Sequence, residues 1–135
     1  LDLQRGDGVG VAAVAVLRAP HAKAGLELVG VREAAGGQRL ERDAVEAVGV
    51  GRRSATVLLF VGLPAGDESE GYDRTHLDLP AAQLALIEAV SVANPRTVVV
   101  LTNGSVVSLE PWHDSVPAIV EGWLLGQAGG VFADH

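Results

Sequence analysis

The sequence lacks cysteine and methionine altogether, and Lys23 is its only lysine. Without cysteine, the chain forms no disulfide bond, thiolate metal site or cysteine nucleophile, and this absence leaves the compartment open. Only 10 lysines and arginines stand against 17 acidic residues, which gives a net charge of −7. Because a basic, phosphate-binding surface is missing, the composition argues against nucleic acid and against an anionic membrane as partners.

Long apolar runs are also missing from the chain. One of the longest covers residues 9–17, whereas a membrane-spanning helix needs about 20 apolar residues. No basic stretch followed by an apolar run opens the chain, so no signal peptide is expected. Methionine is absent even at position 1, which suggests a piece of a longer polypeptide.

Apolar residues are nevertheless abundant, at 48% of the 135 residues, and charged residues make up 20%. This composition supplies enough apolar surface for a buried core and excludes disorder caused by high charge. The length suits one domain and is too short for two. We therefore predict a single domain over residues 1–135.

Continuous apolar runs predict three buried strands, over residues 9–17, 55–63 and 97–102. Continuous rather than alternating runs are typical of strands that are covered on both faces, as in a parallel sheet between helices. A fourth strand is expected over residues 117–125, and a short one over residues 106–109.

Helical patterns lie between these strands. One is expected over residues 42–49, ending at Gly49 or Gly51, and a clearer one over residues 80–94. Residues 18–38 contain several glycines and predict only a weak helix or a loop. The alternation of strands and helices predicts an α/β fold, a three-layer α/β/α sandwich with a mainly parallel sheet.

One stretch, PAGDESEGYDRTHLDLP over residues 64–80, differs from everything around it, and we call it the acidic loop. It follows a predicted strand and precedes a predicted helix, so it lies at the carboxyl edge of the sheet, where α/β proteins bind ligands. Its acidic residues are Asp67, Glu68, Glu70, Asp73 and Asp78. A connection of this length is often functional, although a solvated acidic surface is the simpler interpretation.

Several residues of the acidic loop are candidates for a site. Glu70 is followed by Gly71, where the backbone can approach a ligand closely, and then by Tyr72. Crowded carboxylates raise the pKa of one carboxyl, as a general acid needs, and Arg74 either opposes that rise or holds the loop by pairing with Asp67 or Asp73. Asp67, Glu68 and Asp73 could alternatively bind Mg²⁺, as in an acidic metal-binding α/β domain.

Other candidate sites are weaker. Glycines at positions 6, 8 and 10 precede a strand instead of following one, which disfavours a dinucleotide site, and residues 126–130 (GQAGG) are more typical of a tight turn than of an anion site. The four histidines share no ligand spacing. No cofactor and no dedicated metal site are therefore expected. Trp112 and Trp123 could stack on sugar rings, but Trp123 lies in a predicted strand and is expected in the core.

Three segments together resemble a known family. GLPAGDESEGYDRTHLDLP, LIEAVSVANPRTVVVLTNGSVV and PWHDSVPAIVEGWLLGQAGG are similar, in this order, to the C-terminal α/β domain of glycoside hydrolase family 3, the β-glucosidase family. The resemblance extends from Val57 to about Asp134 and is thinner upstream. It implies that a (β/α)₈-type barrel precedes the domain and that the substrate is a β-glycoside or oligosaccharide.

The resemblance also implies residue roles. In the family the barrel supplies an aspartate nucleophile, and this domain supplies a glutamate that acts as general acid and base. The glutamate immediately before Gly-Tyr matches that position, which makes Glu70 the candidate, with Glu68 as its nearest competitor. Asp67, Tyr72, Asp73 and Arg74 are then expected to support the loop or bind substrate.

The absent barrel is the main departure from the family. Without the barrel nucleophile, the isolated chain is expected not to complete the retaining reaction. A non-catalytic module that binds sugar or a protein partner is the alternative.

Overall fold

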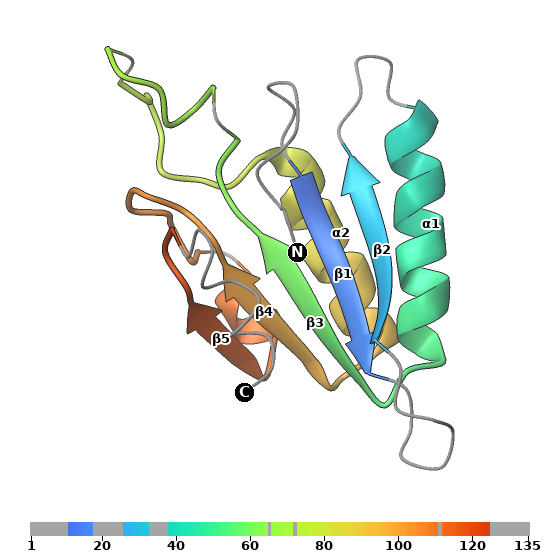
Figure 1. Ribbon diagram of the computed structural model, residues 1–135. Coiled ribbons are helices and arrows are strands. Elements are labelled where there is room, and N and C mark those ends of the chain that lie inside the picture. Colours follow the sequence, from blue (N-terminus) through green and yellow to red (C-terminus); the bar gives the residue numbers. More distant parts are fainter. Residues whose placement is uncertain are drawn as a thin grey trace.

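The computed structural model describes residues 11–17, 26–32, 38–64, 66–71, 73–110 and 112–124, with side chains from residue 43 onward. Its elements are β1 (Val11–Leu17), β2 (Leu26–Arg32), α1 (Gln38–Arg52), β3 (Thr56–Val61), α2 (Ala81–Ala93), β4 (Thr97–Leu101), the short 3₁₀ helix η1 (His113–Ser115) and β5 (Ala118–Glu121). The five strands form one sheet in the order β2-β1-β3-β4-β5 (Figure 1). The predicted α/β class is confirmed.

The sheet has a parallel half and an antiparallel half. Strands β3, β4 and β5 are parallel, as predicted, with Val57 opposite Thr97 and Val98 opposite Ala118. Strand β1 instead pairs antiparallel with both β2 and β3. The connection from Leu17 to Leu26 explains the first of these pairings, because it is shorter than the dozen or so residues that a parallel crossover needs.

Most predicted elements are present, with different ends. Helix α2 agrees with the prediction, whereas α1 continues past Gly49 and Gly51 to Arg52. Two predicted segments are wrong: residues 26–32 form strand β2 instead of a loop or helix, and residues 106–109 form no strand. None of the helices in the described part of the chain is long and apolar enough to cross a membrane.

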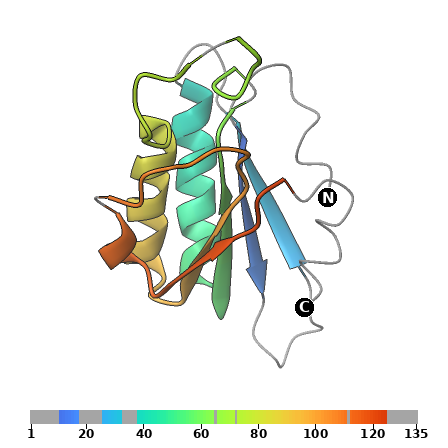
Figure 2. The ribbon, with the colours of Figure 1, turned by 90° about the vertical axis from the view of Figure 1, so that its left-hand side faces the viewer.

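The core lies between the sheet and the two helices. Figure 2 shows α1 and α2 on the same side of the sheet, so the described residues build two of the three predicted layers. Alternate residues of the parallel strands face the helices, because side chains alternate along a strand. The core residues of the strands, helices and loops are Val57, Leu59, Val61, Val99, Leu101, Ala47, Val50, Leu86, Ile87, Val90, Leu79 and Trp112. On the opposite face of the sheet, Phe60 and Val100 are also buried.

One buried amide joins the ends of three elements. Asn94, at the carboxyl end of α2, donates through Nδ2 to the carbonyl oxygens of Gly51 and Ser54, at 2.9 Å each. Its Oδ1 accepts the N–H of Arg96 at 2.8 Å. These bonds satisfy carbonyls near the end of α1 and fix the entry into β4.

Candidate functional site

The three parallel strands end at one edge of the sheet, and the chain segments that leave them lie together there (Figure 1). The acidic loop follows β3, a turn of residues 103–106 follows β4, and residues 122–124 follow β5. We call residues 103–106 the β4 turn. Pairing continues just beyond the strands: Thr102 donates its N–H to Val61 O at 2.9 Å, and Gly122 donates to Leu101 O at 2.8 Å.

Gly62 fixes the point at which the acidic loop leaves the sheet. A Cβ atom at this position would lie 2.0 Å from the carbonyl oxygen of Thr102, so a larger residue cannot fit without moving the backbone. The side-chain amide of Gln83, on α2, bonds to both polar groups of the Gly62 backbone. Gly62 N–H donates to Gln83 Oε1 at 3.0 Å, and Gln83 Nε2 donates to Gly62 O at 2.8 Å.

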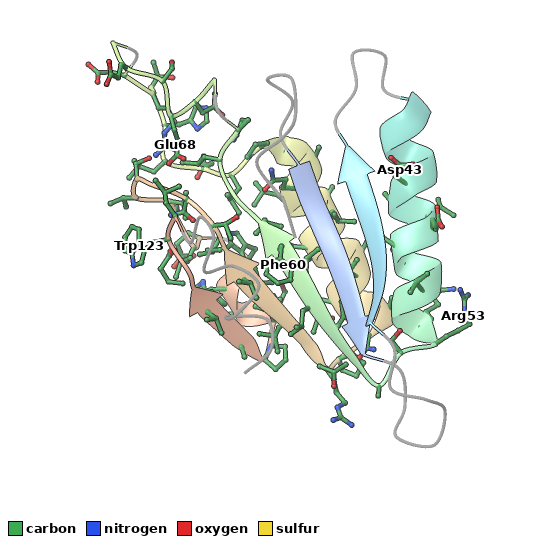
Figure 3. All side chains as sticks on the ribbon, in the orientation of Figure 1. Asp43, Arg53, Phe60, Glu68 and Trp123 are labelled. Carbon is green, nitrogen blue, oxygen red and sulfur yellow. The ribbon has the colours of Figure 1, made fainter. Side chains whose placement is uncertain are left out.

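Glu68 ties the acidic loop to the β4 turn. Its Oε1 atom accepts three hydrogen bonds: from Gly104 N–H at 2.7 Å, from Ser105 N–H at 2.9 Å and from the Ser105 hydroxyl at 3.1 Å. Figure 3 shows Glu68 between the two segments. Two adjacent backbone N–H groups that point at one carboxylate oxygen form an anion-binding concavity. Glu68 is therefore a structural anchor in this conformation.

Arg74 ties the far side of the acidic loop to the same turn. Its Nη2 atom donates to Ser105 Oγ at 3.0 Å and to Val106 O at 2.7 Å. Within the described residues, Arg74 thus holds the loop, but through the β4 turn and not through Asp67 or Asp73 as predicted. The reason is geometric: the turn after the neighbouring parallel strand is brought to the same edge of the sheet.

The other predicted site residues are placed differently. Glu70 and Asp73 are exposed, and Asp67 is half-buried, with its N–H donating to Pro64 O at 2.9 Å. Gly71, next to Glu70, has φ of 76°, and a Cβ atom at this position would meet nothing within 4 Å. A left-handed backbone favours glycine there even though the space is open. Tyr72 lies outside the described residues.

The segment after β5 completes this edge of the sheet. A Cβ atom at Gly104 would lie 3.0 Å from Leu124 Cδ1 and 3.4 Å from Glu68 Oε1, so all three segments meet at this glycine. Trp123 has φ of 53° and donates its N–H to Glu121 Oε1 at 2.8 Å. A left-handed tryptophan is a strained residue of the kind that is common at functional sites.

The two tryptophans occupy different environments, and that of Trp123 is the opposite of the one predicted. Trp123 is 54% exposed, so the expectation that it belongs to the core is wrong. It follows the end of β5 rather than lying within a strand, and Figure 3 shows it at the outer edge. Trp112 is buried in the core, and its Nε1 donates to Ser108 O at 3.3 Å. Trp112 is consequently not a surface for stacking a sugar.

A metal-binding interpretation finds no support in the described part of the chain. No group of three or more His, Asp or Glu side chains in that part comes together closely enough to hold a metal ion. One of the two carboxylate oxygens of Glu68, Oε1, is already used for three hydrogen bonds to the β4 turn.

Sequence reasoning missed the partners that shape this edge. Ser105 and Gly104 belong to the Asn-Gly-Ser segment directly after β4, and Gln83 lies on the buried face of α2. The position of the β4 turn could have predicted its contact with the acidic loop, since segments that follow neighbouring parallel strands lie at the same edge of the sheet. Nothing in the local sequence marks Gln83 as the partner of Gly62.

Comparison with known proteins gives a consistent result. The family model of the glycosyl hydrolase family 3 C-terminal domain matches residues 2–134. The chain is 53% identical over 85 residues to an exo-α-(1→6)-L-arabinopyranosidase of Bifidobacterium longum, covering 63% of this chain and 11% of the relative. It is 46% identical over 105 residues to thermostable β-glucosidase B of Acetivibrio thermocellus, covering 73% and 14%.

A solved structure agrees with these relatives. The GH3 β-glucosidase of Bifidobacterium adolescentis superposes with a TM-score of 0.67 at 50% sequence identity, over 70% of this chain and 14% of that protein. The present chain thus spans only a small part of the length of each of these three proteins.

Proposed function

The chain belongs to the glycosyl hydrolase family 3 C-terminal domains, and from this premise we propose that it delivers Glu70 as the general acid and base of a retaining glycosidase. The carboxylate nucleophile is supplied by the domain to which this one is joined in the family. The carboxyl of Glu70 protonates the glycosidic oxygen as the bond to the sugar breaks, and the nucleophile forms the glycosyl-enzyme. The Glu70 carboxylate then takes a proton from the water that releases the sugar.

The observation that carries the proposal is the contrast between Glu70 and Glu68. Glu68 Oε1 accepts three hydrogen bonds from the β4 turn, so this carboxylate is held back against the sheet. Glu70 is exposed, lies at the carboxyl edge of the parallel strands and precedes a left-handed glycine. A general acid must bring a carboxyl oxygen within hydrogen-bond reach of the reacting atom, and the exposed glutamate meets that need. Retention further requires the two carboxyl groups to be about 5–5.5 Å apart.

The substrate class follows from the relatives. One is named a β-glucosidase and another an arabinopyranosidase, so the proposed substrate is a small pyranoside or an oligosaccharide with such a terminal unit. We give priority to β-glucosides and include α-L-arabinopyranosides as the second test substrate.

The test uses the longest natural chain that contains these residues, with Glu70→Ala and Glu70→Gln variants. We expect a loss of about 10²–10⁴ in rate on an alkyl glycoside, whose leaving group needs a proton, and a much smaller loss in kcat/KM on a dinitrophenyl glycoside. On the dinitrophenyl glycoside, azide should restore turnover of Glu70→Ala and yield a β-glycosyl azide. Azide attacks the glycosyl-enzyme without needing a base.

The control is Asp78→Asn, which removes an exposed carboxylate from the same loop at a residue with no expected role in the site. Equal losses on both leaving groups in Glu70→Gln, or full activity of this variant, would contradict the acid role. An inert wild type with every substrate would favour a non-catalytic module that binds sugar or a protein partner.

A further inference from the structure

We propose that the Ser105 hydroxyl is a positioning group for Glu70, acting through Glu68 and Arg74. This inference rests on the proposed function of Glu70 and adds residues of the β4 turn to its machinery. Ser105 stands 35 positions after Glu70 in the sequence, and none of the bonds described above joins the two residues directly. Its effect on the reaction is therefore indirect.

The Ser105 hydroxyl joins two anchors of opposite charge. It accepts a hydrogen bond from Arg74 Nη2 at 3.0 Å and donates one to Glu68 Oε1 at 3.1 Å. A hydroxyl that accepts from a cation and donates to an anion is polarised in one direction, which strengthens both bonds. Charge-assisted hydrogen bonds are also stronger than neutral ones.

The two anchors lie on either side of Glu70. Glu68 precedes it by two residues and Arg74 follows it by four, and both are fixed to the β4 turn. Within the described residues 66–71, the remaining side-chain bond is a 3.3 Å contact from the Ser69 hydroxyl to Gly66 O. The two anchors therefore constrain the position of Glu70 relative to the sheet. Attachment on both sides restricts the conformations that are open to Glu70, which lies between them.

The expected consequence is kinetic. A general acid displaced by about 1 Å can lose on the order of 10²-fold in rate. Ser105→Ala removes the hydroxyl but keeps the backbone bonds of Gly104 and Ser105 to Glu68 and that of Arg74 to Val106 O. We expect this partial loosening to reduce kcat/KM about tenfold on an alkyl glycoside and less than about twofold on a dinitrophenyl glycoside.

The experiment measures both substrates in the longest natural chain that contains these residues, for Ser105→Ala, Ser105→Thr and a matched control. Ser105→Thr keeps a hydroxyl and should recover activity to within about threefold of wild type. The control is Ser108→Ala, because the Ser108 hydroxyl makes only a 3.3 Å bond to Glu110 O in the segment that follows. It should behave as wild type on both substrates.

A double variant tests whether Ser105 acts through Glu70. In a Glu70→Ala background, Ser105→Ala should cause no further loss on the alkyl glycoside, since effects on one shared group are not additive. Additive losses, equal losses on both leaving groups, or a Ser105→Ala enzyme equal to the Ser108→Ala control would each overturn the inference. The proposed function is judged separately, on Glu70→Gln and on the activity of the wild type, so the two failures are distinguishable.

Discussion

The buried amide of Gln83 offers a quantitative test of how the acidic loop is attached to the sheet. The side chain is 4% exposed and satisfies both the N–H and the carbonyl of Gly62. Gln83→Leu keeps a similar side-chain volume but removes the hydrogen-bond partners of the Gly62 N–H and of the Gly62 carbonyl. Each backbone group that is left buried without a partner costs about 1–3 kcal/mol, which sums to about 2–6 kcal/mol.

Part of this cost is offset, because the leucine buries more apolar surface than the amide does, which contributes about 1–2 kcal/mol. With the middle of each range, the expected net loss in the free energy of unfolding is about 2.5 kcal/mol. For a chain of this length such a loss lowers Tm by about 10 °C. It is smaller than the total stability of a typical domain, about 5–15 kcal/mol, so the variant should still fold.

The assay is equilibrium unfolding of the 135-residue chain in urea, followed by tryptophan fluorescence and by circular dichroism. Coincident transitions from the two probes justify a two-state fit. Glu88→Leu is the matched control, because it places the same side chain at an exposed position of the same helix. It should change stability by no more than about 0.5 kcal/mol. A Gln83→Leu midpoint equal to that of the wild type would refute the reasoning, since the two bonds would then contribute nothing.

Three further predictions concern a close backbone contact, a buried hydrogen-bonded amide and the exposure of the two tryptophans. Gly62→Ala should lower the free energy of unfolding in urea by about 3 kcal/mol, because the methyl group would push the backbones of residues 62 and 102 apart. Gly66→Ala, in open space, should change this free energy by less than about 0.5 kcal/mol. Equal effects would contradict the close approach. Asn94→Ala removes three hydrogen bonds and should cost about 3 kcal/mol in the same assay; a loss below about 1 kcal/mol would count against it. Trp123→Phe leaves the buried Trp112 as the only tryptophan, so its fluorescence should be blue-shifted and poorly quenched by acrylamide. Trp112→Phe leaves the exposed Trp123, so its fluorescence should be red-shifted and readily quenched. The reverse order would contradict the burial of these side chains.

Local patterns were sufficient to predict the parallel half of the fold. The continuous apolar runs identified β3 and β4, and the helical stripe before Asn94 identified α2 with nearly the observed ends. The sequence did not reveal the direction of β1, because an apolar run is equally compatible with parallel and antiparallel neighbours. Strand β2 was missed because glycines on both sides and within it obscured its pattern.

The site was predicted in location but not in its contacts. Its place after a buried strand follows from the rule that ligand sites lie at the carboxyl ends of parallel strands. The attachments of Glu68 and Arg74 to Ser105 span 37 and 31 positions of the sequence, and nothing in the spacing of the acidic loop specifies them. The exposure of Trp123 depends on where β5 ends, and strand ends are the least predictable part of a pattern.

The contiguity of the attachments has a consequence for exchange between genes. Gly62, Gln83, Glu68, Arg74 and the β4 turn all lie within residues 62–106, a single uninterrupted stretch. Swapping this stretch as one block with that of a relative would carry the acidic loop together with the attachments of Gly62, Glu68 and Arg74. A crossover placed between residues 75 and 103 would instead join a loop from one parent to a turn from another. Chimaeras of the second kind contain Glu70 from one parent and the β4 turn, to which Glu68 and Arg74 bind, from the other. The position of the crossover therefore decides whether the loop keeps its geometry.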